Sequence, residues 1–445
     1  MRTLSIVMHL RYLLCIVSFM EVPKNIYMTG IGGIGMSALA QMLHAQGKTV
    51  AGSDREESPT TELLTSKGIH VDIDQAAGNI PEGTGLLIYS DAVPESNPER
   101  MRAKELGIEE LSYFEALGEV SYGMKTIAVT GTHGKTTTTG MLTKILQTAG
   151  KEPTAIIGSI VRDFESNFLA GSDDLLIVEA CEYRDHVLKL SPQILVITNI
   201  EWDHTDYFPT LDALVETFRT AAHKVPHDGY IVTNPAGSNI ARVLAGAQAH
   251  IIDYTQEEVP TLSQIGEFNR ENARAAAAAA RSVFPDIQQG TIDRALLDFK
   301  GSWRRFEYKG ETPLGALVYD DYAHHPTAIE KTLEAVRAKF PDKKIVVAFH
   351  AHLYSRTKSF LKEFARALAK ADRSIIAPIY AAREPNDPSV SNQIIAEEIH
   401  AVGGLSLALD SFDEIRDELL KLDSSHLIIT MGAGDIYKVA DQIAD

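Results

Sequence analysis

Short apolar runs recur along the chain, and several of them lead through a glycine-containing turn into a segment with helical spacing. The runs do not alternate with polar residues, which is typical of strands buried on both faces of a parallel sheet. The clearest lie at residues 85–90, 127–129, 175–178, 194–198 and 230–233, with others in the segments LVYDD, KKIVVAF and HLIITM. This order of strands and helices predicts an α/β fold.

The α/β pattern divides into three stretches, which we expect to be domains of residues 24–123, 124–300 and 301–445. A length of 445 residues agrees with this number at roughly 150 residues per domain. The middle stretch closes with a predicted helix at 266–284, whose alanine run at 275–280 needs only a packing explanation, because alanine has the highest helix propensity.

The first 23 residues precede this pattern. Arg2 and Arg11 stand before a short apolar run at 13–20, as in a signal peptide, but no small-x-small cleavage site follows and the run is too short to span a bilayer. We therefore expect residues 1–23 to be an extension, disordered or read from an upstream start codon, with a targeting segment as the alternative.

Composition narrows the class of protein. The formal net charge of −18 argues against a nucleic-acid-binding surface, which needs clustered lysine and arginine. Hydrophobic residues make up 44% of the chain and charged residues 23%, as in soluble globular proteins. Two cysteines, Cys15 and Cys181, provide no disulfide framework, which fits a reducing cytoplasm.

The segment KTIAVTGTHGKTTTTG (125–140) places a glycine-rich loop between an apolar strand and a helix. Its glycines let backbone N–H groups surround phosphate oxygens, Lys135 supplies a charge for the β- and γ-phosphates, and Thr136 supplies a hydroxyl for Mg²⁺. A tight strand–helix turn with a surface lysine is the alternative. Strand, loop, Lys-Thr and helix in this order predict an ATP site.

An earlier glycine-rich loop follows the strand-like start of the first domain. Gly30, Gly32 and Gly35 match G-x-G-x-x-G, and Asp54 closes the next strand. This fingerprint predicts a diphosphate at a helix N-terminus and a ribose on the acidic residue. Its usual owner is a nicotinamide-dependent dehydrogenase, and a plain strand–helix turn is the other alternative.

Acidic and imidazole side chains follow strands of the middle domain. Glu179 ends the run at 175–178, and His204 follows the run at 194–198. Because the carboxyl ends of parallel strands share one sheet edge with the phosphate loop, we expect both beside Thr136. An oxygen-rich site with one imidazole suits Mg²⁺ or Mn²⁺. Glu182, Asp203 and Asp206 lie at the same strand ends.

Polar residues also gather after strands of the third domain, where they predict a substrate-binding face. The segment GSWRRFEY forms a basic, hinge-like start to this domain. A histidine-rich zinc site is the rival interpretation, although no helix offers a metal-spaced histidine pair. The residues concerned are Asp320, Asp321, Tyr322, His324, His325, His350, His352, Arg356 and Asp435.

Taken together, these motifs resemble the Mur ligases of peptidoglycan synthesis, from about residue 24 to the end of the chain. The segments that carry the resemblance are GIGGIGMSALA, TGTHGKTTTT, EACEY, NIEWDHTDYF, FNREN, WRRFE, DDYAHHPTAI, YSRT and TMGAGDIY. The resemblance implies a Rossmann-like domain for a UDP-sugar, a central P-loop ATPase domain and a Rossmann-like domain for an amino acid. It reassigns the first glycine-rich loop from a dinucleotide to UDP-N-acetylmuramate, since both carry a diphosphate.

Within the family, the resemblance is closest to the branch that joins L-alanine to UDP-N-acetylmuramate. It implies that ATP activates the lactyl carboxylate as an acyl phosphate, with Mg²⁺ or Mn²⁺ as cofactor. The implied catalytic residues are Lys135, His204, His352 and Arg356, and the implied metal ligands are Thr136, Glu179 and His204. The implied ATP-binding residues are Gly131, Thr132, His133, Gly134, Lys135, Thr136, Thr137, Asn269, Asn272, Arg305 and Tyr322. The implied UDP-sugar-binding residues are Gly30, Gly32, Gly33, Gly35, Asp54, Ser90 and His324.

Several positions depart from the family pattern. Gln75 and Phe268 each replace an expected histidine, and Leu353 replaces an arginine expected beside the anionic substrate. Losing one charge-assisted contact costs about 1.5–3 kcal/mol of binding. Arg356 then remains as the nearby cation. No lysine stands close behind His204, which fits the family members that do not rely on a carbamylated lysine.

Three alternatives stay open at this point. One is a ligase that attaches a preformed peptide to the same UDP-sugar, the second is a nicotinamide-dependent dehydrogenase, and the third is a non-catalytic ATP-binding switch. We expect a cytoplasmic enzyme, monomeric or homodimeric, without nucleic-acid partners and without stable membrane insertion.

Overall fold

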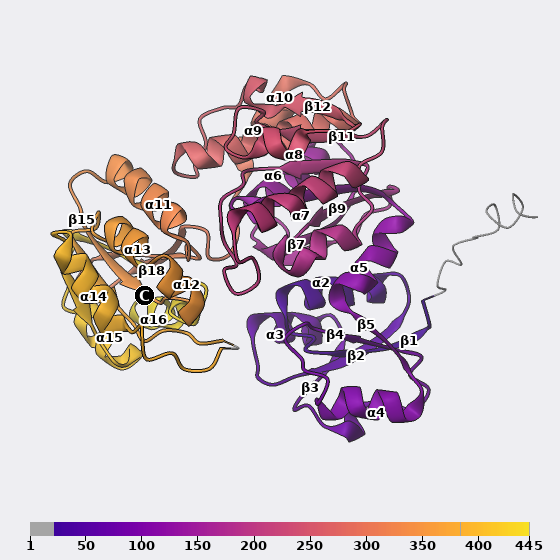
Figure 1. Ribbon diagram of the computed structural model, residues 1–445, viewed down its shortest axis with the longest axis horizontal. Helices are drawn as coiled ribbons and strands as arrows, with labels where there is room; N and C mark the ends of the chain where they lie inside the picture. The colour runs from indigo at the N-terminus through magenta and orange to yellow at the C-terminus, as the bar shows by residue number, and fades with distance from the viewer. Residues whose placement is uncertain (1–21, 383, 445) are drawn as a thin grey trace, which may run out of the picture.

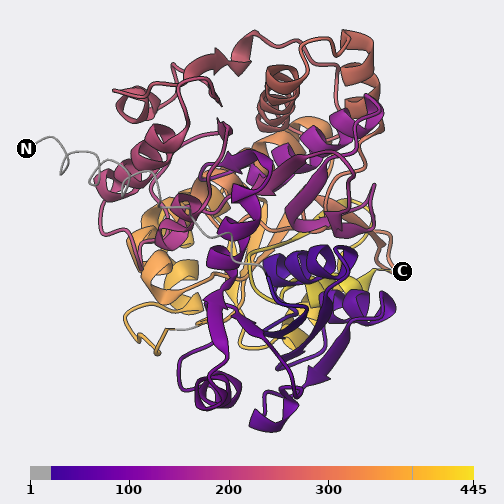
Figure 2. The same cartoon turned by 90° about the vertical axis from the view of Figure 1, so that its right-hand side faces the viewer.

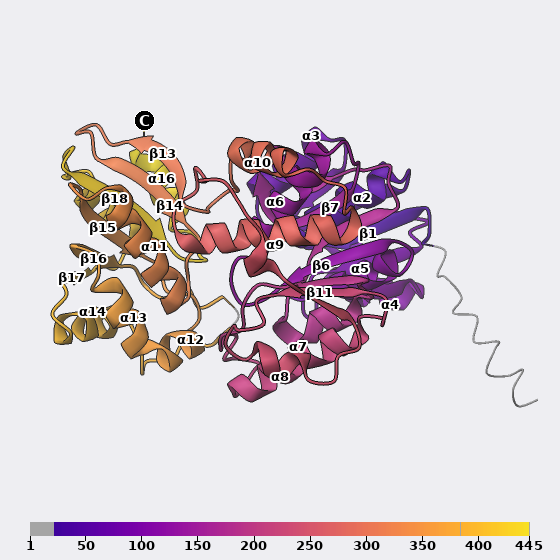
Figure 3. The same ribbon diagram turned by 90° about the horizontal axis from the view of Figure 1, so that it is seen from above.

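A computed structural model describes residues 22–382 and 384–444, which form three α/β units, each built on its own sheet (Figure 1). The first unit lies beneath the middle unit in two perpendicular views (Figures 1 and 2), and the third unit stands to one side (Figures 1 and 3). The predicted α/β class with three sheets is confirmed. The expectation for residues 1–21 lies outside the described residues.

The first unit carries a parallel sheet in the order β3-β2-β1-β4-β5. The order reverses between β1 and β4, and in open α/β sheets ligands bind at such a switch point, where the first glycine-rich loop lies. Its elements are β1 (Asn25–Thr29), α2 (Ile34–Ala45), β2 (Thr49–Asp54), α3 (Pro59–Ser66), β3 (His70–Ile73), η1 (Ala77–Asn79), β4 (Leu86–Tyr89), α4 (Pro98–Leu106), β5 (Glu109–Ser112) and α5 (Tyr113–Tyr122).

The middle unit has the strand order β12-β11-β10-β6-β9-β7-β8, and only β8 runs antiparallel to its neighbour. The phosphate-loop strand β6 is central, between β10 and β9. Its elements are β6 (Lys125–Thr130), α6 (Lys135–Thr148), β7 (Thr154–Val161), β8 (Ser166–Leu169), β9 (Leu175–Glu179), η2 (Tyr183–Lys189), β10 (Ile194–Ile197), α7 (Leu211–Lys224), β11 (Tyr230–Thr233), α8 (Ile240–Leu244), β12 (His250–Asp253), η3 (Tyr254–Gln256), α9 (Glu267–Val283) and α10 (Gln289–Asp298).

The third unit has the strand order β13-β14-β18-β15-β16-β17, with β13 antiparallel to β14. Among the described residues, no helix is long and apolar enough to cross a bilayer. The elements of this unit are β13 (Glu307–Glu311), β14 (Leu317–Asp321), α11 (Pro326–Lys339), β15 (Lys344–Phe349), α12 (Tyr354–Ser359), α13 (Leu361–Leu368), β16 (Arg373–Ile376), α14 (Asn392–Ala401), β17 (Ser406–Ala408), α15 (Phe412–Leu419), β18 (His426–Met431) and α16 (Tyr437–Ile443).

Two contacts position the glycine-rich loops. Helix α9 packs along α6, and its alanines at 275–280 are all buried, so their small side chains let the two helices approach closely (Figure 3). Helix α2 docks on the hairpin β7–β8 through buried polar groups: Asn167 accepts from Gln41 and donates to Ser37, and Ser166 donates to Gln41. Buried polar groups that satisfy one another in this way fix the first unit against the middle one.

Candidate active site

One cavity of about 710 Å³ is lined by residues of all three units. Gly32 and Gly35 reach it from the first unit, the phosphate loop from the middle unit, and His324 from the third. Its volume is in the range of sites that enclose a small ligand. Residues that follow different strands thus line one cavity together with the phosphate loop.

Two glycines of the phosphate loop have positions that no other residue could take. Gly131 has φ +129° and a Cβ there would lie 2.1 Å from Thr198 Oγ1; Gly134 has φ +84° and a Cβ would lie 2.2 Å from Asn272 Oδ1. Positive φ and such close approach both require glycine. The backbone conformation of the loop thus requires glycine at both positions.

Asn199, two residues after β10, forms hydrogen bonds with the backbone of the phosphate loop. Its carbonyl accepts from Thr132 N at 3.0 Å, and its side-chain oxygen accepts from His133 N at 2.9 Å. Helix α6 then begins at Lys135 without a capping side chain from the described residues. The N–H groups of its first turn have no intrahelical partner, so this helix N-terminus is suited to a phosphate.

Lys135 is held by the buried carboxylate of Glu182. Lys135 Nζ lies 3.0 Å from Glu182 Oε2, and the other oxygen of Glu182 lies 3.2 Å from His204 Nε2. Burial alone would lower the pKa of Lys135, but attraction by Glu182 outweighs it and the pKa is raised. Burial likewise opposes ionisation of Glu182, yet Lys135 and His204 lower its pKa. Both groups are therefore charged at neutral pH.

Thr136 and Glu179, two of the three predicted metal ligands, face each other. Thr136 Oγ1 donates to Glu179 Oε1 at 3.0 Å, and Gly158 N donates to Glu179 Oε2 at 2.7 Å. The third predicted ligand, His204, lines the same cavity and has φ +52°. Strained backbone at a non-glycine residue often marks a functional position, because the rest of the fold must hold it there.

The two consecutive arginines of the WRRFE segment have different surroundings. Arg304 is buried and donates to Asp320 and to the carbonyls of Gly432 and Gly434, so it anchors the third unit internally. Both arginines line the cavity, but among the described residues only Arg305 forms a hydrogen bond to the phosphate-loop helix α6. Its guanidinium donates to Thr136 Oγ1 at 3.1 Å. Arg305 therefore links the third unit to the start of α6.

The other predicted ATP-binding residues surround the same loop. The guanidinium carbon of Arg305 lies 5.0 Å from the ring centre of Tyr322, a cation–π distance. Asn272 donates to Asn269 Oδ1 and packs its side chain against Gly134. The structure thus brings Asn269, Asn272, Arg305 and Tyr322 together around the cavity.

A buried polar network joins the middle unit to the third. Arg356 Nε donates to Asp203 Oδ1 at 2.8 Å, an Arg356 amino group lies 3.1 Å from His352 Nδ1, and Asp203 Oδ2 lies 3.9 Å from His324 Nε2. Burial opposes ionisation of Asp203, but Arg356 holds its pKa well below the usual range. Burial and then Arg356 lower the pKa of His324, which is neutral at pH 7. The network groups His324, His352 and Arg356 as predicted.

The first glycine-rich loop opens into the same cavity. Gly32 N donates to Asp54 Oδ2 at 2.8 Å, so the loop's own backbone engages the predicted ribose ligand. Helix α2 begins after Gly33 with no capping side chain among the described residues. Ser90 lies against Gly30. The ligand roles of Asp54 and Ser90 stay predictions.

The departures from the family pattern occupy two kinds of place. Gln75 accepts from Asn97, the N-cap of α4, and Phe268 and Leu353 line the cavity. His350, three residues before Leu353, is buried, and its Nδ1 has no hydrogen-bond partner in the part of the chain that the structure describes; burial lowers its pKa to about 4. Phe268 and Leu353 therefore bear on ligand binding, and Gln75 on local structure.

Sequence reasoning did not assign roles to Glu182 and Asn199, although both follow strands at the predicted edge. The signal was available for each: Glu182 is three residues beyond Glu179 in EACEY, and Asn199 begins the NIEWDH segment. What it could not supply is that Glu182 reaches Lys135 and that Asn199 reaches the backbone of His133. These partners lie 47 and 66 residues away.

Comparison with known proteins places the chain among ligases of one family. Family models described as "Mur ligase family, catalytic domain", "Mur ligase middle domain" and "Mur ligase, glutamate ligase domain" match residues 25–123, 129–261 and 304–434. The UDP-N-acetylmuramate–L-alanine ligases of Lachnospira eligens and Caldicellulosiruptor saccharolyticus are each 37% identical, over 95% of this chain and 98% of theirs.

Solved structures agree with this placement. The crystal structure of a UDP-N-acetylmuramate-alanine ligase from Thermotoga maritima has a TM-score of 0.79 and 25% identity, covering 94% of this chain and 98% of its own. A murein peptide ligase from Psychrobacter arcticus has a TM-score of 0.73 at 23% identity, covering 95% of this chain and 100% of its own, which supports the shared fold.

Proposed function

The chain belongs to the Mur ligase family, and from this premise we propose that it joins L-alanine to the lactyl carboxylate of UDP-N-acetylmuramate with hydrolysis of ATP to ADP and phosphate. The middle domain of the family binds ATP. Relatives that share 37% identity over nearly the whole chain bear the name of this activity. The reaction supplies a precursor of peptidoglycan.

The observation that supports the proposal best is that two uncapped helix N-termini, those of α2 and α6, open into one cavity. Each is suited to phosphate groups. A diphosphate-bearing sugar on α2 and a triphosphate on α6 would meet in the space between them. A dehydrogenase would use the first loop and leave the second without a purpose.

A free carboxylate is a poor acyl donor, so the first step installs a leaving group. The lactyl carboxylate attacks the γ-phosphorus, the bond to the bridging oxygen breaks, and an acyl phosphate and ADP form. The amine of L-alanine then attacks the acyl carbon, and inorganic phosphate leaves as the amide bond forms. Two anions must meet at phosphorus, so charge neutralisation and positioning dominate catalysis.

The chain's own cations provide this neutralisation. Lys135 is already charged but paired with Glu182, so an incoming triphosphate competes with that carboxylate for the ammonium. Arg305 approaches from the third unit and contacts the start of α6 through Thr136. ATP therefore binds where the third unit meets the phosphate loop, which ties nucleotide binding to the placement of the amino-acid side.

The residues at this edge fit a divalent cation. The hydroxyl of Thr136 and the carboxylate of Glu179 face each other beside the phosphate loop, and His204 lines the same cavity. Two oxygens and one imidazole suit Mg²⁺ or Mn²⁺. We propose that these three residues hold the metal, which when bound would neutralise phosphate charge.

Phosphate release from ATP tests the function. We expect release only when UDP-N-acetylmuramate and an amino acid are both present, with L-alanine preferred over glycine and L-serine. Substituting the tripeptide L-alanyl-γ-D-glutamyl-meso-diaminopimelate for L-alanine tests the preformed-peptide ligase in the same assay. Release that is indifferent to the sugar nucleotide would contradict the proposal.

The need for ATP leads us to propose a cytoplasmic enzyme. We also propose that it acts as a monomer or a homodimer. Light scattering after size-exclusion chromatography distinguishes these two states, and a larger assembly would contradict both.

A further inference from the structure

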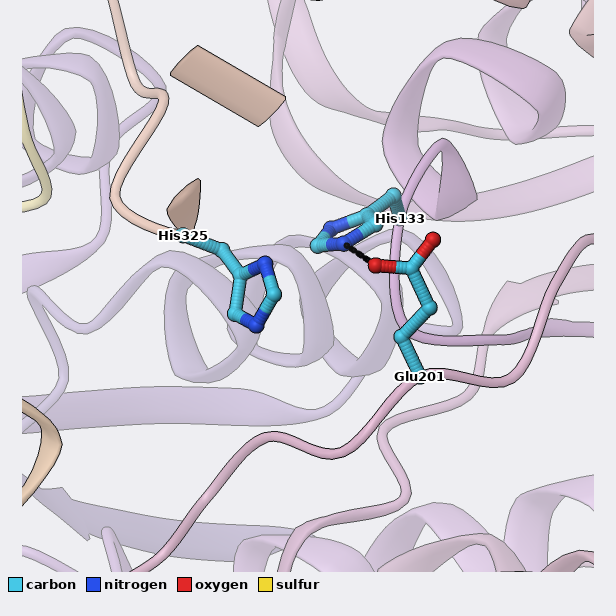
Figure 4. A group of neighbouring side chains, drawn as sticks. All are labelled: His133, Glu201 and His325. Atoms are coloured by element: carbon cyan, nitrogen blue, oxygen red, sulfur yellow. Dashed lines mark ion pairs between the residues drawn. The ribbon is translucent and has the colours of Figure 1, made fainter. Parts of the chain in front are cut away.

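Three potential metal-binding side chains from separate segments lie close together (Figure 4), and one of them, His133, lines the cavity. His133 comes from the phosphate loop, Glu201 from the loop after β10, and His325 from the start of α11 in the third unit. One ligand atom from each lies within 4.8 Å of the other two. We call these three residues the His-Glu-His cluster.

The hydrogen bonds of His325 fix which ring nitrogen carries the proton. Its Nε2 lies 3.1 Å from the carbonyl oxygen of Trp202, which can only accept, so Nε2 carries the proton and Nδ1 carries the lone pair. Metal-binding histidines commonly donate their other N–H to a carbonyl in this way. Nδ1 accepts a hydrogen bond of 3.3 Å from Thr327 N, which makes His325 the N-cap of α11, and a bound metal ion would replace this bond.

The other two members of the His-Glu-His cluster also offer a ligand atom. His133 Nε2 lies 3.5 Å from Glu201 Oε2 and is buried without a hydrogen-bond partner among the described residues. Burial would raise the pKa of Glu201, but its attraction to the nearby His133 outweighs this and the pKa falls to about 2. Burial, together with the proximity of His133, lowers the pKa of His325 to about 4. Near pH 7 the cluster thus has an anionic oxygen and a neutral imidazole, the protonation states that metal binding requires.

We propose that the His-Glu-His cluster binds one transition-metal ion of the Zn²⁺ class and thereby fastens the third unit to the phosphate loop. Two imidazoles and one carboxylate form a donor set typical of Zn²⁺. Metal–ligand bonds of about 2.0–2.1 Å put tetrahedral ligand atoms roughly 3.3 Å apart. The 3.5 Å between His133 Nε2 and Glu201 Oε2 is already close to this separation. The ligand atom of His325, within 4.8 Å of the other two, would have to move closer.

This site is separate from the one assigned to the ATP-linked cation. Glu201 and His325 are not among the described residues that line the cavity, and His133 alone reaches it. The donor sets also differ, since Thr136 and Glu179 offer oxygens to a harder cation. The two sites should therefore select different metals.

A second group of potential ligands, Cys181, Glu182 and His204, is a weaker candidate. Burial raises the pKa of Cys181 to about 12, so the thiol stays protonated, whereas the thiolate is the metal ligand. Lys135 is already paired with Glu182 at 3.0 Å and would repel a cation. This rival provides the control for the test.

The test is a Zn²⁺ titration of the full chain, stripped with chelator and dialysed, in excess Mg²⁺ and without ATP, with a chromophoric chelator as competitor. We expect one tight equivalent in the wild type. Glu201→Gln keeps the shape but removes the anionic ligand, and should weaken Zn²⁺ binding more than about 10-fold, the minimum seen when only a supporting residue is lost. Cys181→Ser and His227→Ala, the latter with a side chain 87% exposed, should bind as the wild type does.

A second variant guards against misfolding. His325→Asn removes the imidazole but retains a good helix N-cap, and it should lose Zn²⁺ binding while its circular dichroism is unchanged. Zn²⁺ should raise the melting temperature of the wild type and not that of either cluster variant. Tight binding that survives both cluster substitutions, or that Cys181→Ser abolishes, overturns the proposal. A thiolate charge-transfer band in the Co²⁺-loaded protein would overturn it as well.

Discussion

The ion pair between Arg356 and Asp203 offers the sharpest test of how the third unit is held against the middle one. The two side chains are only 3% and 4% exposed and their atoms lie 2.8 Å apart. We expect Arg356→Met to weaken this junction strongly, because methionine leaves the Asp203 carboxylate buried without its counter-charge.

The magnitude follows from burial. Removing one member of a buried ion pair costs about 3–5 kcal/mol, which is roughly a 150- to 5,000-fold change in an equilibrium constant. Asp203→Asn leaves the guanidinium unpaired and should cost a comparable amount. The double variant leaves no buried charge, so it should be less destabilised than the sum of the two, with a coupling energy of at least about 1.5 kcal/mol.

Tryptophan fluorescence can report on this junction specifically. The chain has two tryptophans. Trp202 packs edge-on against Phe360 of the third unit, with ring centres 5.4 Å apart, so Trp303→Phe leaves a single reporter at the contact. In that background, urea titrations of the wild type, both single variants and the double variant complete a double-mutant cycle. We expect both single variants to lose the contact at lower urea.

Additivity would refute the reasoning. If the two substitutions sum to within about 0.5 kcal/mol, Arg356 and Asp203 do not stabilise each other and the junction depends on other contacts. Lys358→Met is a matched control, because its pair with Asp387 is solvent-exposed and should contribute less than about 1 kcal/mol.

Three further predictions concern the nucleotide site and its surroundings. Lys135→Ala should lower ATP-dependent phosphate release more than about 100-fold with unchanged circular dichroism, and retained turnover would exclude its role. Arg305→Gln should weaken ATP binding by about 1.5–3 kcal/mol in calorimetry, because Arg305 lines the cavity beside the phosphate loop and the variant would lose a charge-assisted contact with the triphosphate; unchanged affinity would contradict this. Burial raises the pKa of Asp321 to about 6 in the folded protein. Below pH 4 its carboxyl is protonated in both the folded and the unfolded state, whereas above pH 6 its ionisation destabilises the folded state by about 3 kcal/mol. Asp321→Asn should therefore gain stability relative to the wild type as pH rises from 4 to 7 in urea titrations, and a constant difference would contradict this.

Much of the fold could be predicted because its signals are local. The strands β6, β9 and β10 are short apolar runs, and the helix after the phosphate loop begins where glycine gives way to Lys135. The hairpin β7–β8 and helix α10 were not predicted. Strands β7 and β8 differ from the buried parallel runs because they pair antiparallel with each other at the sheet edge, and β8 contacts α2 of another unit.

The candidate site could be predicted by residue type, but the partner of each residue could not. Strand-end position alone selects Glu179, His204 and Arg356. That Lys135 is held by Glu182, or that Arg356 is held by Asp203, 153 residues away, depends on how three separate sheets dock. Docking is a property of packed surfaces and leaves no periodic signal in the sequence.

The two glycine-rich loops show why sequence chemistry alone left a dehydrogenase open. A helix N-terminus offers the same unpaired N–H groups and the same partial charge to any diphosphate, so the first loop cannot distinguish NAD from a UDP-sugar. Discrimination comes from what shares the cavity. Helix α6 presents a second phosphate-binding N-terminus and the charged Lys135 to the same cavity. A carboxylate on a ligand bound at α2 can therefore reach a triphosphate bound at α6. Hydride transfer needs no triphosphate beside the substrate, whereas activation of a carboxylate by ATP requires one.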